Sequence, residues 1–255
     1  MLRSRIIPCL LIHKKGLVKT VNFKTPKYVG DPINAVKIFN EKEVDELMVL
    51  DIDATYEGRE PSFELIKKLA FECRMPLCYG GGVKTVEHAK RIISLGAEKV
   101  AISSAAISNI HLLHDIGKAV GVQSVVVVLD VRKKKLFGGY EIVTHNAEKS
   151  HGIEFKDFLL RLNEIGIGEL VINSVDGDGT MQGYDFKLFD IVRESVDMPI
   201  SILGGAGSVK DIQTAIDRYK TIGVSAGSLF VFKGKYRAVL ISYPEFEERR
   251  NLYGL

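Results

Sequence analysis

Short apolar runs rich in β-branched residues alternate along the whole chain with segments whose apolar positions recur at helical spacing. The runs predict strands near residues 5–12, 47–53, 77–80, 98–103, 124–131, 169–174, 200–204 and 222–227. Eight strands with intervening helices over 255 residues predict a closed (β/α)8 barrel, a TIM barrel, in a single domain spanning 1–255. A doubly wound open sheet is the alternative.

The predicted helices begin and end at recognisable residues. Asp31 and Pro32 supply an N-cap and a first-turn proline, Thr85 precedes the segment VEHAKRIISLG, and Ser208 with Asp211 has the spacing of a capping box. Glycine commonly ends a helix, and Gly96 and Gly166 stand where two helical patterns stop. The helices are therefore predicted independently of the strands.

An internal repeat strengthens the barrel prediction. DELMVLDIDATYEG (45–58) resembles GELVINSVDGDGTMQG (168–183), and MPLCYGGGVKTVEHA (75–89) resembles MPISILGGAGSVKDIQTA (198–215). The offset is 123 residues in three places, from Glu46 to Glu169, from Met75 to Met198 and from Gly81 to Gly204. Such regularity indicates a duplicated unit. We therefore expect two similar half-barrels, about 1–121 and 122–255, and a ligand with two similar ends.

Composition narrows the class of protein. The chain is 46% hydrophobic and 26% charged, as in ordinary globular proteins, and no apolar run is long enough to span a bilayer. The basic and apolar residues at the start lack a cleavage site, so we interpret them as a first strand and expect a cytoplasmic protein without membrane contact. The net charge of +3 does not indicate nucleic acid but suits small anions. Cys9, Cys73 and Cys78 are expected to be reduced thiols.

Glycines and small hydroxyl residues recur at matching places in the two halves. Each half has a glycine pair after its third strand and small residues after its fourth, namely Gly81, Gly82, Ser103 and Ser104 in the first and Gly204, Gly205, Gly227 and Ser228 in the second. Glycine lets backbone N–H groups approach an anion, and in barrels phosphate commonly binds in the loops after strands 7 and 8. We therefore predict two phosphate sites. Tight barrel corners are the alternative explanation.

One carboxylate stands where a barrel enzyme needs it. Asp130 ends the apolar run SVVVVLD, so it is expected at the barrel mouth, where it suits acid/base catalysis. A capping or salt-bridged aspartate is the alternative. Aligning IIPCLL (6–11) with VVVVLD (125–130) makes Leu11 its counterpart. His111 and His114 share a helix face but have no further ligands that we identify, so no metal site is predicted.

These motifs closely resemble the cyclase (synthase) subunit of imidazole glycerol phosphate synthase. The resemblance covers nearly the whole chain and is carried by RIIPCL, DPINAVKIFNEKEVDELMVLDIDAT, YGGGVKTVEHA, GAEKVAISSAA, VVVVLDV, DGDGTMQGYD and GGAGS. It implies a barrel of the ribulose-phosphate-binding type and a ribulosyl aminoimidazole carboxamide nucleotide, with a phosphate at each end, as the phosphorylated small-molecule ligand. It also implies a glutaminase partner, docked on the amino-terminal barrel face, whose ammonia crosses the barrel, and no cofactor.

The resemblance assigns expected roles to individual residues. Phosphate contacts are expected at Gly82, Ser103, Ser104, Gly179, Gly205, Gly227 and Ser228, although the family usually has Asn-Thr in place of Ser103-Ser104. Substrate contacts are expected at Lys19, Asp51, Asp176 and Asp178. Lys19 is placed in the loop after the first strand, where a solvated lysine is the alternative. The expected ammonia gate is Arg5, Glu46, Lys99 and Glu169, with a structural plug of the barrel floor as the alternative.

The chain departs from the family at Leu11, where family members carry a second catalytic aspartate. Losing an acid/base group typically slows the step that it serves by about 10²–10⁴-fold. His13, which we expect in the loop after the first strand, is a possible substitute. We therefore expect the family's cyclase reaction to be the property that changed, while the predicted gate indicates that ammonia is still used.

Four functions stay open. The first is a synthase-like subunit that receives ammonia for a non-histidine acceptor, such as a surface-polysaccharide (lipopolysaccharide) sugar, with a third amidotransferase protein as a further partner. The second is an imidazole glycerol phosphate synthase of histidine biosynthesis that tolerates Leu11. The third is a non-catalytic protein that binds and activates a glutaminase. The fourth is a phosphosugar isomerase, whose reaction would also require two acidic side chains.

Overall fold

Eight parallel strands close into a barrel in the computed structural model, which describes residues 3–135 and 138–254. Neighbouring strands pair in the order β10, β11, β12, β1, β4, β5, β6, β7, and β7 pairs again with β10. The barrel strands are β1 (Arg5–His13), β4 (Leu47–Asp51), β5 (Leu77–Gly80), β6 (Lys99–Ile102), β7 (Val125–Lys133), β10 (Glu169–Ser174), β11 (Ile200–Leu203) and β12 (Gly223–Ala226). The predicted (β/α)8 barrel is confirmed, and the open sheet is excluded.

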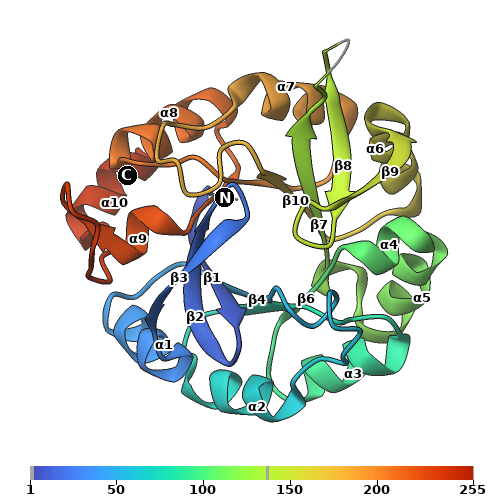
Figure 1. Ribbon diagram of the computed structural model, residues 1–255, viewed down its shortest axis with the longest axis horizontal. Coiled ribbons are helices and arrows are strands. Elements are labelled where there is room, and N and C mark those ends of the chain that lie inside the picture. Colours follow the sequence, from blue (N-terminus) through green and yellow to red (C-terminus); the bar gives the residue numbers. More distant parts are fainter. Residues whose placement is uncertain (1–2, 136–137, 255) are drawn as a thin grey trace.

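Helices surround the barrel on all sides (Figure 1). They are α1 (Pro32–Glu41), α2 (Phe63–Glu72), α3 (Val86–Ser94), α4 (Ser104–Ser108), α5 (His111–Val120), α6 (Phe155–Ile165), α7 (Phe186–Ser195), α8 (Val209–Tyr219), α9 (Ser228–Val231) and α10 (Phe246–Tyr253), with a 3-10 turn at Val122–Ser124. The predicted caps are present: Asp31 accepts from the N–H of Asn34, and Ser208 and Asp211 form a reciprocal capping box.

Two apolar clusters hold the fold together. The larger lies between strands and helices, because each helix turns one apolar face toward the barrel. The smaller fills the barrel interior, where inward-facing residues alternate with outward-facing ones along each strand. Its buried members are Ile7, Cys9, Met48, Cys78, Ala101, Val126, Val128, Val171 and Leu203, with Leu11 and Leu50 packed against it.

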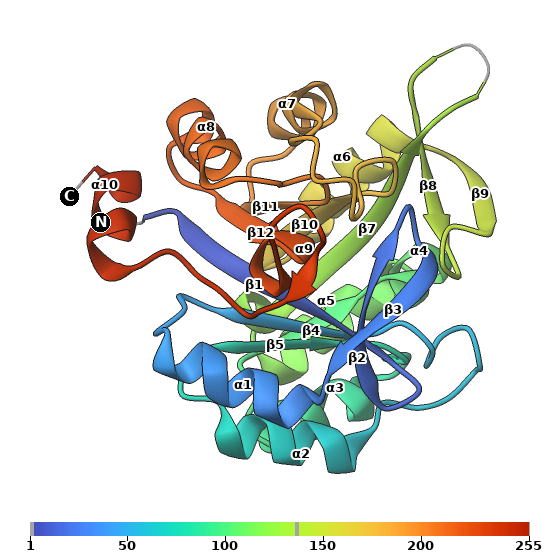
Figure 2. The same cartoon turned by 60° about the vertical axis from the view of Figure 1, so that its left-hand side comes forward.

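Two antiparallel ribbons were not predicted from the sequence. After β1 the chain forms β2 (Gly16–Val21) and β3 (Lys24–Gly30), and after β7 it forms β8 (Tyr140–Thr144) and β9 (Lys149–Glu154). A short pair, β13 (Phe232–Lys233) with β14 (Ala238–Val239), follows α9. Both ribbons extend beyond the carboxyl ends of the barrel strands, whereas α10 and both termini lie at the opposite end (Figure 2).

The two halves carry the same order of elements. In each half the first barrel strand continues into a ribbon, and three further barrel strands follow. The ribbons therefore belong to the repeat that the sequence indicates, while the boundary between residues 121 and 122 stays a prediction. Among the helices of the described residues, none combines the length and apolarity needed to cross a bilayer.

Candidate active site at the barrel mouth

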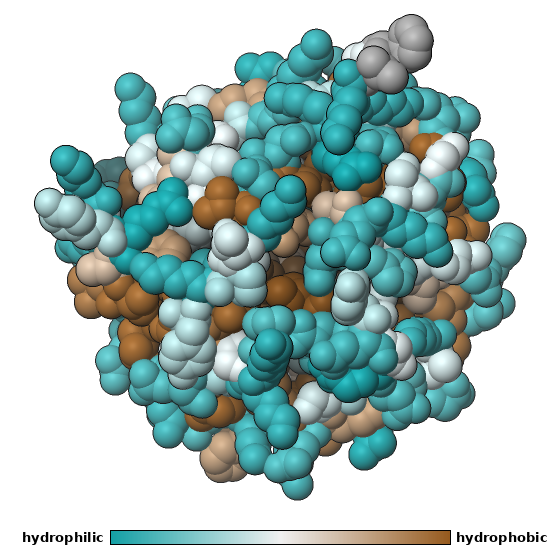
Figure 3. Space-filling view, viewed as in Figure 1, coloured by the Kyte–Doolittle hydropathy of each residue, from teal (hydrophilic) through white to brown (hydrophobic). Residues whose placement is uncertain are grey.

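A cavity of about 620 Å³ opens at the carboxyl ends of the barrel strands. Active sites of this fold lie at that end, in the loops that follow the strands. The space-filling view shows a hollow with apolar walls near the centre of this face, surrounded by polar side chains (Figure 3). The cavity is lined by the inner ends of the barrel strands and by residues of both ribbons. It is therefore the candidate site.

All of the residues predicted to bind phosphate line this cavity. They are Gly81, Gly82, Ser103, Ser104, Gly179, Gly204, Gly205, Gly227 and Ser228. Gly82 and Gly205 have φ angles of +71° and +115°, a region that residues with a Cβ rarely adopt. A Cβ at Gly205 would lie 2.1 Å from the carbonyl oxygen of Gly183. The structure thus brings the two predicted half-sites to one cavity and explains two of its glycines sterically.

Asp130 is a half-buried acid that lines the cavity. It lies near the end of β7, and its Oδ1 accepts a hydrogen bond of 2.9 Å from Nδ2 of Asn173 on the neighbouring strand β10. Burial raises the pKa of Asp130 to about 7, with a further contribution from Asp178, while the hydrogen bond from Asn173 opposes the rise. A carboxyl group that titrates near neutral pH can both accept and donate a proton, as acid/base catalysis requires.

Lys19 lies in a strand and not in a loop, which corrects the prediction from the sequence. The ribbon strand β2 turns the side chain into the cavity, where it is 5% exposed and Nζ donates a hydrogen bond to the carbonyl oxygen of Cys9. Burial lowers the pKa of Lys19, although Cys9 and Asp178 act in the other direction. Lys19 is therefore a buried amine of the site, and a solvated loop lysine is excluded.

Asp178 and Asp51 also line the cavity, and both carboxylates are held by neighbouring groups. Asp178 accepts a 2.6 Å hydrogen bond from Oγ1 of Thr20, which ties the loop after β10 to the first ribbon. Asp51 Oδ1 accepts from the backbone N–H groups of Asp53 and Ala54, each at 3.0 Å. Burial raises the pKa of both aspartates despite these hydrogen bonds.

Asp176 does not belong to the cavity, contrary to the expected substrate contact. It is exposed, is absent from the cavity lining, and accepts a 2.8 Å hydrogen bond from the backbone N–H of Lys133. This bond holds the loop after β10 against the end of β7. The family resemblance assigned both Asp176 and Asp178 to the substrate, but of these two residues of one loop only Asp178 lines the cavity.

Leu11 and His13 both line the cavity from β1. Leu11 packs against the inner apolar cluster and supplies no group that exchanges a proton. The prediction of His13 in a loop is wrong: it is the last residue of β1, and its Nδ1 lies 2.7 Å from Oδ1 of Asp53. The imidazole of His13 therefore lies two residues beyond Leu11 on the same strand.

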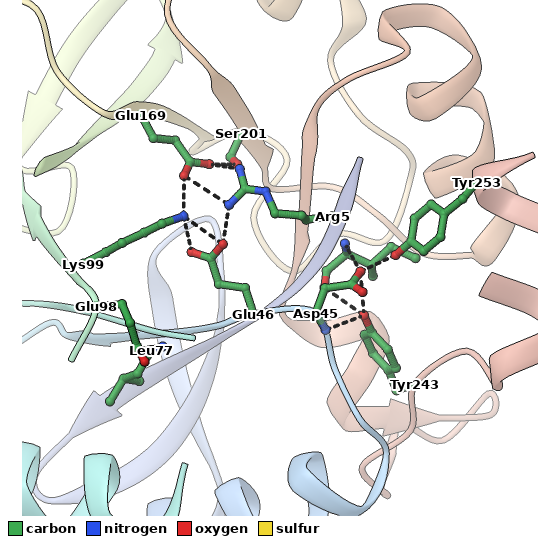
Figure 4. Close-up of polar contacts among 11 residues, drawn as sticks. Arg5, Asp45, Glu46, Leu77, Glu98, Lys99, Glu169, Ser201, Tyr243 and Tyr253 are labelled. Carbon is green, nitrogen blue, oxygen red and sulfur yellow. Dashed lines mark hydrogen bonds and ion pairs between the residues drawn. The ribbon is translucent and has the colours of Figure 1, made fainter. Parts of the chain in front are cut away.

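The four charges predicted as a gate meet at the other end of the barrel (Figure 4). Arg5 binds both acids, with Nη2 at 2.7 Å from Oε1 of Glu169 and Nη1 against Glu46. Lys99 Nζ lies 2.8 Å from Glu46 and 2.8 Å from Glu169. The two acids thus alternate with the two bases in a closed ring. Ser201 on β11 donates a further hydrogen bond to Glu169.

The ring compensates charges that burial alone would disfavour. The side chains of Glu46 and Glu169 are 3% and 5% exposed. Burial acts to lower the pKa of Arg5 and Lys99 and to raise that of Glu169. The opposite charges outweigh it, so the pKa of Arg5 and Lys99 is raised and that of Glu169 is lowered. All three groups are therefore held in their charged forms.

Several cavity residues were not identified from the sequence. Asn173 holds Asp130, and a polar residue near the end of an apolar strand was a usable signal for it. His145 lines the cavity from the turn after β8, where its φ is +54° and its Nδ1 lies 2.8 Å from Oγ1 of Thr144. No sequence signal predicts that turn. Among the described residues no cluster of three potential metal-binding side chains occurs.

Comparison with known proteins places the chain among close relatives. The family model described as histidine biosynthesis protein matches residues 5–237. A Vibrio vulnificus (strain YJ016) protein named "Putative imidazole glycerol phosphate synthase subunit hisF3" is 53% identical over 251 residues, 98% of this chain and 96% of that one. The Leptospira interrogans protein named "Putative imidazole glycerol phosphate synthase subunit HisF" is 50% identical over 253 residues, 99% and 100% of the two chains. "Imidazole glycerol phosphate synthase subunit HisF" of Lactococcus lactis subsp. cremoris (strain SK11) is 38% identical over 230 residues, 90% and 89% of the two chains.

Proposed function

This chain belongs to the imidazole glycerol phosphate synthase cyclase subunits of the histidine biosynthesis protein family, and on that premise we propose that it adds ammonia to a phosphorylated acceptor other than the histidine-pathway nucleotide. A glutaminase docked at the amino-terminal end of the barrel supplies the ammonia. The observation that carries the proposal is the combination of a complete ring of four charges with a mouth that keeps Asp130 but has Leu11 in place of the second acid.

The barrel interior supports passage of ammonia. Above the ring the inner residues are apolar or weakly polar, among them Ile7, Met48 and Val126. An isolated ion is costly in such surroundings, whereas neutral ammonia is not. In this proposal the ring controls entry of the small neutral molecule at the floor, and the apolar interior disfavours passage of ammonium. Arg5, Glu46, Lys99 and Glu169 are therefore proposed as the gate, in preference to a purely structural plug.

The mouth supports a ligand with two phosphate groups. The glycine pairs after β5 and β11 lie in one cavity with the small residues that begin α4 and α9. Lys19 adds a buried amine, a hydrogen-bond donor, within the same cavity. Phosphate binding by both halves, with substrate contacts at Lys19, Asp51 and Asp178, is the assignment that we propose.

Leu11 decides which acceptor we propose. The histidine-pathway reaction of the family uses two aspartates, and here one is an isobutyl side chain packed on the inner apolar cluster. The acceptor class that the family resemblance supplies is a sugar of a surface polysaccharide, amidated with the help of a third protein. The cyclase reaction of histidine biosynthesis is the second candidate, and the observation that favours it is the imidazole of His13 in the same cavity.

Complementation of a bacterium that lacks its own cyclase tests the proposal. Wild-type protein, produced with its glutaminase, is expected not to restore growth without histidine, whereas Leu11→Asp is expected to restore it. The reason is that Asp130 and the glycines proposed to bind phosphate line the mouth, whereas the aspartate that the family carries at position 11 is absent. Growth supported by the wild-type protein would contradict the non-histidine acceptor and establish the second candidate.

The two proposed phosphate sites have a separate test. Gly205→Ala is expected to abolish one of two inorganic phosphate sites counted by titration calorimetry, because the added Cβ would lie 2.1 Å from the oxygen of Gly183 and displace the loop. Gly166→Ala is the matched control: Gly166 has a φ of +74°, nothing lies within 4 Å of the added Cβ, and it ends α6. Backbone strain of about 1–3 kcal/mol is expected in both variants. Two intact sites in Gly205→Ala would contradict the assignment of Gly205 to a phosphate site.

A further inference from the structure

The imidazole of His13 and the carboxylate of Asp53 form a hydrogen-bonded pair at the edge of the cavity. His13 lies two residues beyond Leu11 on β1, and side chains two apart along a strand share a face. Its side chain is 27% exposed, and it lines the same cavity as Asp130. The imidazole is thus presented to the mouth of the barrel from the strand that carries Leu11.

Asp53 is held rigidly enough to orient the ring. Its Oδ1 lies 2.7 Å from Nδ1 of His13, and its Oδ2 accepts a 2.7 Å hydrogen bond from the backbone N–H of Lys14. Its own N–H donates to Asp51, and its side chain is 10% exposed. A carboxylate oxygen accepts, so Nδ1 carries the proton of the pair. In the neutral ring Nε2 is then the free basic nitrogen.

His13 and Asp130 come from opposite walls of the barrel. In the closed strand order, β7 is the fourth strand from β1 in either direction. A ligand that fills the cavity between these strands therefore has an imidazole on one side and a carboxyl group on the other. Such a pair can act on the two ends of a reacting bond.

Four other titratable side chains of the cavity have partners of their own. Lys19 Nζ donates to the carbonyl of Cys9, and Asp178 accepts from Thr20. Asp51 caps a turn and lies 3.6 Å from Arg59. His145 contacts a hydroxyl group and not a carboxylate. Among these described residues, His13 is the imidazole that a carboxylate orients.

We propose that His13, positioned by Asp53, is the second acid/base group of this site and acts across from Asp130 in place of the carboxyl group absent at Leu11. The inference rests on the proposed function, ammonia addition to a carbonyl carbon. There the C–N bond forms, Asp130 takes one proton from the nitrogen, and the imidazolium of His13 gives one proton to the oxygen. The hydroxyl group formed in this way then leaves as water together with a second proton from the nitrogen, and the product is an imine. Overall, the carbonyl compound and ammonia give the imine and water, with no net gain or loss of protons.

Carbethoxylation by diethyl pyrocarbonate, mapped by mass spectrometry on the full chain, tests the pair. The reagent acylates an unprotonated imidazole nitrogen and releases ethanol and carbon dioxide. His13 is expected to react faster than the exposed His114 on α5, although His13 is the more buried. In Asp53→Asn the amide donates to Nδ1 and forces the proton onto Nε2, so the His13 rate is expected to fall about tenfold or more. Asp53→Glu keeps a carboxylate and is expected to recover part of the rate.

Two results would overturn the inference: a His13 rate no higher than that of His114, or an unchanged His13 rate in Asp53→Asn. A ligand separates this failure from failure of the proposed function. The ribulosyl aminoimidazole carboxamide nucleotide serves as a two-phosphate probe, with binding followed by calorimetry. Bound probe that leaves His13 unprotected rejects His13 as a group facing the ligand. If the nucleotide does not bind, the phosphate sites are judged by the titration with inorganic phosphate, and the pair is judged by the His13 rate in Asp53→Asn.

Discussion

Leu11→Asp is expected to raise ammonia-dependent conversion of the ribulosyl aminoimidazole carboxamide nucleotide by about 10²–10⁴-fold over the wild-type protein. Leu11 lines the cavity on β1 and has only intermediate exposure, so a carboxylate there faces the same space as Asp130. Turnover is measured with ammonium salt and purified protein, which makes the result independent of the glutaminase.

The size of the gain depends on proton exchange and not on polarity alone. Leu11→Asn has nearly the shape of the aspartate variant but exchanges no proton, so it is expected to stay at the wild-type level. Leu50→Asp places a carboxyl group on the neighbouring strand β4, whose Leu50 pairs with Leu11, and is expected to be equally inactive. Adding Asp130→Asn to Leu11→Asp is expected to remove the gain. Equal activity of Leu11→Asp and Leu11→Asn would show that the missing acid is not what separates this chain from its relatives.

The barrel strands were predictable from the sequence because each is buried on both faces. Parallel barrel strands form nearly continuous apolar runs, and the predicted run at 169–174 coincides with β10 (Glu169–Ser174). The ribbons escaped prediction for the opposite reason. All seven residues of β3 are exposed or half-buried, so its composition is that of a loop. Lys19, in β2, was consequently placed in a loop.

The candidate site was predictable where the repeat marked it. Gly82 and Gly205 belong to matching glycine pairs, and both line the cavity. The pair of His13 and Asp53 had no such mark. Its members are 40 residues apart and meet only because β1 and β4 are neighbours in the closed barrel. Contacts of this kind depend on strand order, which periodicity along the chain does not contain.

Glu169→Ala is expected to lower the free energy of unfolding by about 3–5 kcal/mol, measured by urea denaturation at pH 7. Its carboxylate binds Arg5, Lys99 and Ser201, and without it two cations remain at the barrel floor with Glu46 alone. Domains of this kind are stable by about 5–15 kcal/mol, so we expect the variant to fold. Glu164→Ala, at an exposed position of α6, is the matched control and is expected to change stability by less than about 0.5 kcal/mol.

The pH dependence of Glu169→Gln separates the charge of Glu169 from its packing, because glutamine keeps the size and loses the charge. The pKa of Glu169 is lowered in the folded protein by Arg5 and Lys99 in spite of burial. Its contribution is therefore complete above the pKa of an unfolded glutamate, about 4.3, and is lost as the pH falls through the lower folded value. The stability difference between the wild-type protein and Glu169→Gln should accordingly narrow below about pH 4. A difference that stays constant down to pH 3 would assign the role of Glu169 to packing, and a gate that depends on alternating charges would then lose its basis.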